Sequence, residues 1–110
     1  MHTMNNDMQA CIDACIKCYQ TCLSTALHHC LEAGGKHTEP EHFGLMMACA
    51  EMCRASAHVM MTGSAAHKHS CRACADICEA CAADCRQVGD MDECVSVCQA
   101  CAEQCRRMAA

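Results

Sequence analysis

Polar and apolar positions along the chain repeat with the period of an α-helix. Three segments carry the pattern C-x3-C-x2-C-x3-C, whose steps of four, three and four residues place every cysteine on one stripe of a helix. A β-strand would need steps of two residues. The three runs are Cys11, Cys15, Cys18 and Cys22; Cys74, Cys78, Cys81 and Cys85, preceded by Cys71; and Cys94, Cys98, Cys101 and Cys105. Charged side chains lie off these stripes, so the pattern predicts amphipathic helices that point cysteine inward.

Turn and capping residues divide the chain into four predicted helices, over residues 6–33, 39–62, 65–88 and 91–108. Glycine ends each of the first three, at Gly34–Gly35, Gly63 and Gly89. Thr38–Glu41 fits a capping box with proline in the first turn, and Ser64 fits a cap for the third helix. Because the connections are short, we expect antiparallel neighbours. The prediction is an all-α, up-down-up-down four-helix bundle that forms a single domain over residues 1–110.

The second predicted helix differs from the other three. Its stripe runs through His42, Met46, Cys49, Cys53, Ser56 and Met60, so only two cysteines lie on it. Cys30 also departs from the pattern, since it falls about one position off the stripe of the first helix. These departures place methionine and histidine near the ends of the predicted core.

The composition does not supply a conventional hydrophobic core. The chain of 110 residues has 16 Cys and 10 Met but no Trp, one Tyr and one Phe. Cysteine and alanine occupy positions where Leu, Ile and Phe normally lie. Such a bundle should be only marginally stable as an apo monomer, so we expect bound metal or self-association to stabilise it. The net charge of −5 gives no reason to expect a nucleic acid partner.

The sequence predicts reduced thiols rather than disulfides. Residues 1–15 lack the basic and apolar regions of a secretory signal, and no apolar run is long enough to cross a bilayer. We therefore expect a cytoplasmic protein without a membrane partner, in a compartment that keeps thiols reduced. Helical residues four apart have Cβ atoms about 5–6 Å apart, whereas a disulfide needs about 3.8 Å. Sulfurs that share a metal at about 2.3 Å each lie roughly 4–4.6 Å apart, so the C-x3-C spacing favours chelation.

The type of metal follows from coordination chemistry. Soft thiolate ligands select Cu(I), Zn(II) or iron–sulfur clusters. Structural zinc needs closed sets of four ligands, and iron–sulfur clusters gather four cysteines, usually on loops. Cu(I) accepts two or three thiolates, so stripes of close pairs can hold several ions. The sequence predicts storage or buffering of multiple Cu(I) ions without enzymatic activity, and the alternative is a Zn(II) or general heavy-metal thiolate buffer or chaperone. A thiol oxidoreductase is disfavoured because the stripes point inward and no cysteine pair stands out.

All sixteen cysteines are candidate metal ligands, namely the three runs above together with Cys30, Cys49 and Cys53. Histidine and methionine at the helix ends are candidates for the mouth of the store. The candidate end ligands are His29, His42, Met46, Met91, Met60, His67 and Met108. In an antiparallel bundle the first four gather at one end, with Cys30, and the last three at the other, with Met4 and Met8. By contrast, we expect His37, Asp84 and Glu103 to be solvated.

Three stretches carry a family resemblance. They are Cys98–Arg106, Cys74–Cys81 and the opening Ala10–Cys15, and together with the repeat they resemble the bacterial cytosolic copper storage proteins. The resemblance implies a four-helix bundle that assembles as a homotetramer and stores many Cu(I) ions, mostly on C-x3-C pairs. It also implies that histidine and methionine at one end guide ions inward, and that copper donor or acceptor proteins or small thiols are partners. This chain departs from the family in its His-poor third connection, Gln87–Met91, and in its two-cysteine second stripe.

Overall fold

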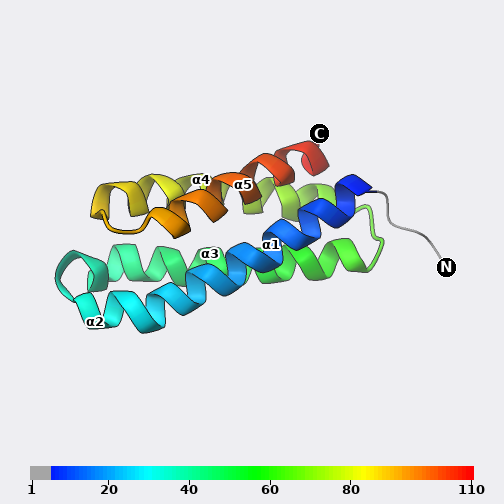
Figure 1. The fold of residues 1–110 in the computed structure, drawn as a ribbon. Helices are drawn as coiled ribbons and strands as arrows, with labels where there is room; N and C mark the ends of the chain where they lie inside the picture. The colour runs from blue at the N-terminus through cyan, green and yellow to red at the C-terminus, as the bar shows by residue number, and fades with distance from the viewer. Residues whose placement is uncertain (1–5) are drawn as a thin grey trace.

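The computed structural model describes residues 6–110 and is helical over nearly all of them (Figure 1). The first long helix has three parts, α1 (Asn6–Thr25), a π-helical turn η1 (Ala26–Cys30) and α2 (Leu31–Ala33). A 3-10 turn, η2 (Gly35–Thr38), leads into the remaining helices, which are α3 (Pro40–Met61), α4 (His67–Val88) and α5 (Asp92–Ala109).

The helices form the predicted up-down-up-down four-helix bundle. α1 packs beside α3 and α5, and α4 packs beside the same two helices, so each helix has two direct neighbours. The result is a rod of 48 × 21 × 19 Å. The η2 turn and the α4–α5 turn lie at one end, and the α3–α4 turn and the C-terminus lie at the other (Figure 1). None of the helices in residues 6–110 is long and apolar enough to span a membrane.

Glycine ends the helices as the sequence indicates, but the predicted capping box is wrong. Gly34, Gly63 and Gly89 all have positive φ, a backbone conformation that other residues rarely adopt. Ser64 is not the cap of α4 either, because the N-cap is Ala66 and it has no side-chain hydrogen bond. Ser64 Oγ accepts a hydrogen bond from the Ala66 N–H at 3.0 Å within the preceding turn. Thr38 belongs to the η2 turn, where its hydroxyl donates to the Gly35 carbonyl at 3.2 Å. It therefore cannot cap α3, whose N-cap is Glu39 without a side-chain hydrogen bond.

The π-helical turn explains how Cys30 reaches the core. Cys30 lies eight residues after Cys22, and in a regular helix that separation turns a residue about 80° away from the stripe. In η1 the Leu31 N–H bonds to the Ala26 carbonyl, five residues back instead of four. The turn absorbs one extra residue, and Cys30 is fully buried.

The core consists of sulfur and small side chains. All sixteen cysteines are at most 1% exposed, and only Ile12, Met46 and Met60 among the fully buried side chains are larger than cysteine. Alanines such as Ala75 and Ala82 fill the flanks of the thiol stripes. The second-helix stripe is buried along its whole length, as predicted, and in residues 6–110 its His42 and Ser56 are the only buried side chains classed as polar.

The two outer faces of the bundle differ in chemistry. The exposed large apolar side chains are Leu27, Leu31, Met47 and Met61, and all of them lie on the α1–α2 segment or on α3. The α4–α5 face is charged instead, and Arg106 there pairs with Asp76 and Glu79.

Candidate metal centre

The structure brings all sixteen predicted thiols into one interior column. The three cysteine runs come from α1, α4 and α5, α3 contributes Cys49 and Cys53, and η1 contributes Cys30. Each run faces inward because its steps of three and four residues keep it on one side of its helix. None of the sixteen is disulfide-bonded.

Sulfurs within one helix lie at chelating distance. Four of the C-x3-C pairs have Sγ–Sγ separations between 3.8 and 4.0 Å, namely Cys18–Cys22, Cys74–Cys78, Cys81–Cys85 and Cys101–Cys105. A disulfide would need about 2.05 Å. Ordinary side-chain rotations bring these sulfurs to the roughly 4–4.6 Å that a shared metal requires.

Sulfurs on different helices lie equally close, which the stripes alone did not reveal. Cys53 Sγ is 3.5 Å from Cys78, 3.7 Å from Cys74 and 3.8 Å from Cys101. Cys98 Sγ is 3.6 Å from Cys22. The thiol column is therefore connected across helices as well as along them, and an ion has bridging positions in both directions.

Several groups of thiols converge on a single point. Two groups of four share no member, and in each the sulfurs lie within 4.8 Å of one another; they are Cys18, Cys22, Cys49 and Cys98, and Cys53, Cys74, Cys78 and Cys101. At the end of the column that lies beside the α3–α4 turn, Cys11, Cys71 and Cys105 form a group of three. Ser56 Oγ lies 3.6 Å from Cys71 Sγ there, so a hydroxyl stands where other layers carry a thiol.

Neighbouring thiols shift one another's pKa in opposite directions. The S–H groups of Cys101 and Cys105 hydrogen-bond to Cys15 and lower its pKa to about 6. The pKa of Cys105 is raised instead, because its contacts with Cys101, Cys11 and Cys15 hold its proton. Burial raises the pKa of Cys30, and the negative charge of Cys94 adds to the effect. Neighbouring S–H groups are thus the donors that stabilise a thiolate in this core.

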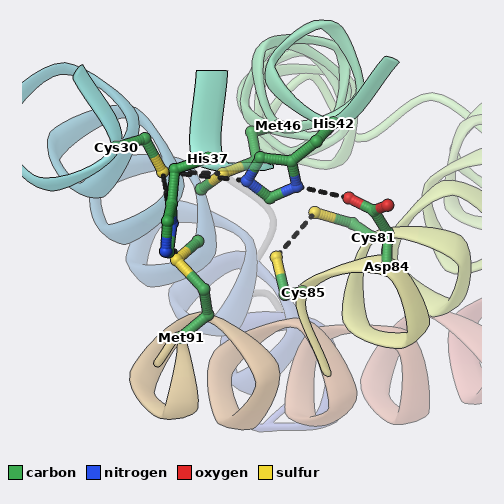
Figure 2. A network of polar contacts seen from close by, with 8 residues as sticks. All are labelled: Cys30, His37, His42, Met46, Cys81, Asp84, Cys85 and Met91. Carbon is green, nitrogen blue, oxygen red and sulfur yellow. Dashed lines mark hydrogen bonds and ion pairs between the residues drawn. The ribbon is translucent and has the colours of Figure 1, made fainter. Parts of the chain in front are cut away.

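A mixed cluster of sulfur and nitrogen surrounds Cys30 at the end of the bundle beside η2 (Figure 2). Four side chains approach its Sγ, at 3.7 Å for His42 Nε2, 3.8 Å for His37 Nδ1, 3.8 Å for Met46 Sδ and 3.9 Å for Met91 Sδ. We call these five residues the Cys30 cage. Three of the predicted end ligands, His42, Met46 and Met91, lie in it.

Two residues of this end were expected to be solvated, and the structure corrects both expectations. His37 returns over the core on the η2 turn and contacts Cys30. Asp84 accepts a hydrogen bond from His42 Nδ1, and its side chain is only 29% exposed. With Nδ1 bonded to Asp84, the His42 ring directs Nε2 at Cys30, the arrangement that suits a metal ligand. Cys81 and Cys85, whose Sγ atoms are 4.0 Å apart, lie near this pair (Figure 2).

His29 lies further out than the cage. Its ring meets that of His37 edge-on, with 5.0 Å between centroids. Its Nε2 atom is buried, makes no hydrogen bond and lies 3.9 Å from Asp90. His29 therefore borders the cage through His37, on the side of the α4–α5 turn.

The opposite end is closed by methionine. Met60 is fully buried, and Met8 and Met108 pack against the core while partly exposed. His67 does not point at the thiols, because its Nδ1 donates to the Ser64 carbonyl at 2.9 Å and holds the turn before α4. Met4 lies outside the described residues. Imidazole next to thiol is therefore found at the η2 end within residues 6–110.

Comparison with known proteins gives the chain its relatives. The sequence profile of the copper storage protein family, Csp, matches residues 4–110. A crystal structure of a protein from Nitrosospira multiformis is 54% identical and superposes with a TM-score of 0.94, over 96% of this chain and 97% of that one. The Cu(I)-bound copper storage protein BsCsp3 is 39% identical, with a TM-score of 0.87 over 96% and 100% of the two chains. Among curated proteins, the uncharacterized cysteine-rich protein YhjQ of Bacillus subtilis (strain 168) is 40% identical over 82 residues, 74% of this chain and 75% of the relative.

Proposed function

Because this chain belongs to the copper storage protein family, we propose that its thiol column stores several Cu(I) ions per chain. The sixteen cysteines act as the ligands, and C-x3-C pairs together with cross-helix pairs hold the ions. The relative BsCsp3 has been seen with Cu(I) bound. The role is one of storage and buffering, and the proposal includes no catalysed reaction.

The observation that carries this proposal is the continuity of the buried thiols. Sulfur contacts of 3.5–4.0 Å run along the column and across it, so most thiols have more than one bridging partner. Cu(I) is a soft ion and prefers thiolate and thioether ligands. Low coordination lets one thiolate bridge two ions, and a continuous column can then hold more ions than it has isolated pairs.

The Cys30 cage is the proposed mouth of the store. It combines thiol, thioether and imidazole at the surface end of the column, and a cleft lined by Lys36, Glu39, His42 and Asp84 opens beside it. Thioethers bind Cu(I) without losing a proton, so the cage can pass an ion from an exposed donor to the interior thiolates. Copper donor or acceptor proteins and small thiols are the proposed exchange partners, in the cytoplasm.

A titration of the reduced protein with Cu(I), against a chelator of known affinity, tests storage. We expect the protein to hold many ions per chain before the chelator gains any. Saturation at one or two ions would contradict storage and would instead fit a chaperone that carries a single ion.

The groups of four thiols support a second candidate, a Zn(II) buffer, because four sulfurs within 4.8 Å of one another match a tetrahedral site. A competition between Zn(II) and Cu(I) for the reduced protein separates the two functions. Retention of Zn(II) in the presence of buffered Cu(I) would favour the zinc buffer.

Self-association through the α1–α3 face is also part of the proposal. An apolar groove lined by Ile16, Tyr19, Ala57 and Met61 runs between these helices, and the exposed Leu27, Leu31 and Met47 extend the same face. A monomer leaves this surface in water, whereas a second copy would bury it. We propose a homo-oligomer, a tetramer by the family resemblance, that pairs these faces.

A further inference from the structure

We propose that the thiol column accepts soft monovalent cations as a class, Ag(I) as well as Cu(I), and discriminates against Zn(II) and Cd(II) because it holds no compensating positive charge. This inference rests on the proposed storage function. It concerns which ions the column accepts, and the reason is the net charge of the complex that each ion forms with the thiolates.

The core contains no cationic side chain. The eight Lys and Arg side chains of the sequence are Lys17, Lys36, Arg54, Lys68, Arg72, Arg86, Arg106 and Arg107, and every one is exposed. The one buried imidazole, His42, is already bonded to Asp84 at the end of the column. A negative charge in the middle of the column therefore has no cation to pair with in residues 6–110.

Backbone donors cannot supply the missing charge either. Zinc sites on loops direct free N–H groups at their thiolates, but these cysteines lie inside helices whose N–H groups bond to the carbonyl four residues back. Cys94 is the exception, since it lies in the first turn of α5, where N–H groups are free. For the other stripe positions, neighbouring S–H groups are the available donors, as between Cys101 and Cys15 at 3.6 Å.

Charge balance then separates the two classes of ion. When monovalent ions fill the column, each ion binds two sulfurs and each thiolate bridges two ions. One Cys–SH per ion then loses its proton, and the column stays neutral. When a divalent ion binds four thiolates, as in the Cys53, Cys74, Cys78 and Cys101 group, four protons leave and two negative charges remain. Uncompensated charge in a buried site is strongly unfavourable. Neutrality would require a divalent ion to keep two of its four ligands protonated, which weakens its binding.

The group of Cys11, Cys71 and Cys105 offers a direct test. Three thiolates around a divalent ion carry one net negative charge, and Ser56 lies 3.6 Å from Cys71 Sγ. Ser56→Lys puts an ammonium group into that layer and makes the same complex neutral. Ser56→Met is the matched control, since it adds similar bulk without charge.

The experiment compares Cd(II) and Ag(I) binding by the reduced native chain and by both variants, with proton release measured by a pH indicator. At full loading we expect the native chain to release about one proton per Ag(I), and we expect its first Cd(II) to release about two. We expect S56K to bind its first Cd(II) roughly ten-fold or more tightly than the native chain and S56M do, because an opposite charge within a few ångströms has an effect of that size. Its Ag(I) binding should be unchanged or weaker.

Three results would overturn the inference. The first is the release of four protons when the native chain binds its first Cd(II). The second is a Cd(II) affinity of S56K equal to that of the native chain. The third is a gain in Cd(II) affinity in S56M as large as the gain in S56K. If S56K does not fold, proton release by the native chain still decides the question. Failure of the native chain to store Ag(I) and Cu(I) would instead contradict the proposed storage function. Storage of both ions together with tight Cd(II) tetrathiolate binding would contradict this inference alone.

Discussion

Cys30 differs from the other fifteen thiols in the chemistry of its neighbours. The stripe thiols are surrounded by other thiols, whereas two imidazoles and two thioethers surround Cys30. Asp84 fixes the ring of His42 through Nδ1 and leaves Nε2 directed at Cys30. An ion bound in the cage would therefore have a coordination environment that no interior position offers, with one ligand oriented by a carboxylate.

Removing the carboxylate should weaken the cage without emptying the interior. We predict that Asp84→Asn lowers Cu(I) affinity at the cage about ten-fold or more, because partners that orient a ligating histidine typically contribute that much. Total Cu(I) capacity should stay nearly unchanged, since the stripe thiols are untouched. Chelator competition measures the Cu(I) affinity of the cage and the total capacity, and stopped-flow mixing measures the rate of uptake.

His42→Ala removes the ligand itself and should have at least as large an effect, and Glu103→Gln on the outer surface of α5 is the control. Equal loss of capacity and rate in the Asp84 variant would show that the carboxylate supports the whole bundle rather than the cage.

Sequence reasoning found the thiols of this site but missed two of its partners. The heptad steps locate the stripe cysteines because local periodicity fixes the direction of a side chain on a helix. His37 lies in a turn, and its approach to Cys30 depends on the path of the chain after Gly34, which has a φ of +67°. Asp84 lies beside the cysteine stripe of α4, and its contact with His42 depends on where α3 places that histidine. Both contacts are tertiary, so spacing along one helix could not reveal them.

Among the elements, the π-helical turn η1 explains how Cys30 is buried although a regular helix would turn it away from the stripe. The stripe from Cys11 to Cys22 follows the α-helical period, and one extra residue before Cys30 breaks it. The sequence pattern predicts Cys30 off the stripe because the prediction assumes a regular helix. The structure removes the mismatch by widening one turn, so that the Leu31 N–H bonds five residues back. The glycines at the helix ends and Pro40 at a helix start made the element boundaries predictable, whereas the local helix type was not.

Deleting one residue from η1 tests this account. In a variant that lacks the exposed Leu27, Cys30 lies seven residues after Cys22, which is on the stripe of a regular α-helix. We predict that the deletion keeps Cys30 buried and leaves the Cu(I) capacity unchanged. Insertion of an alanine after Leu27 should instead turn Cys30 outward. Iodoacetamide labelling of the apo protein, read by mass spectrometry, reports the exposure of each thiol, and rapid labelling of Cys30 in the deletion variant would contradict the prediction.

For the whole molecule, the difference between the two outer faces is a prediction about assembly. The α1–α3 face carries the exposed Leu31 and Met47, and the α4–α5 face carries charge. We predict that Leu31→Glu together with Met47→Glu converts the oligomer to monomers, because burying unpaired carboxylates opposes association. Ala80→Glu on the exposed side of α4 is the control and should leave assembly intact. Sedimentation velocity of the apo proteins measures the outcome, and a native chain that is already monomeric would contradict the proposed interface.

Copper loading should also determine the stability of the bundle. The core is built from thiols and alanines. The fully buried apolar side chains larger than cysteine are Ile12, Met46 and Met60, so apolar burial contributes little for a chain of this length.

An ion that binds the folded core and not the unfolded chain stabilises the fold by about 2.7 kcal/mol when its free concentration is 100 times its dissociation constant. For a domain of roughly 100 residues, that corresponds to a rise in Tm of about 10 °C or more. We therefore predict that Tm climbs stepwise as Cu(I) is added and falls back when a Cu(I) chelator removes it, as followed by the helical signal in far-UV circular dichroism. Sulfurs of α1, α3, α4 and α5 contact one another across the core, so ions bound between them would act as cross-links that the apo bundle lacks. A Tm that did not move at full loading would mean that the ions bind outside the helical core, because only ions held between the helices can couple loading to unfolding.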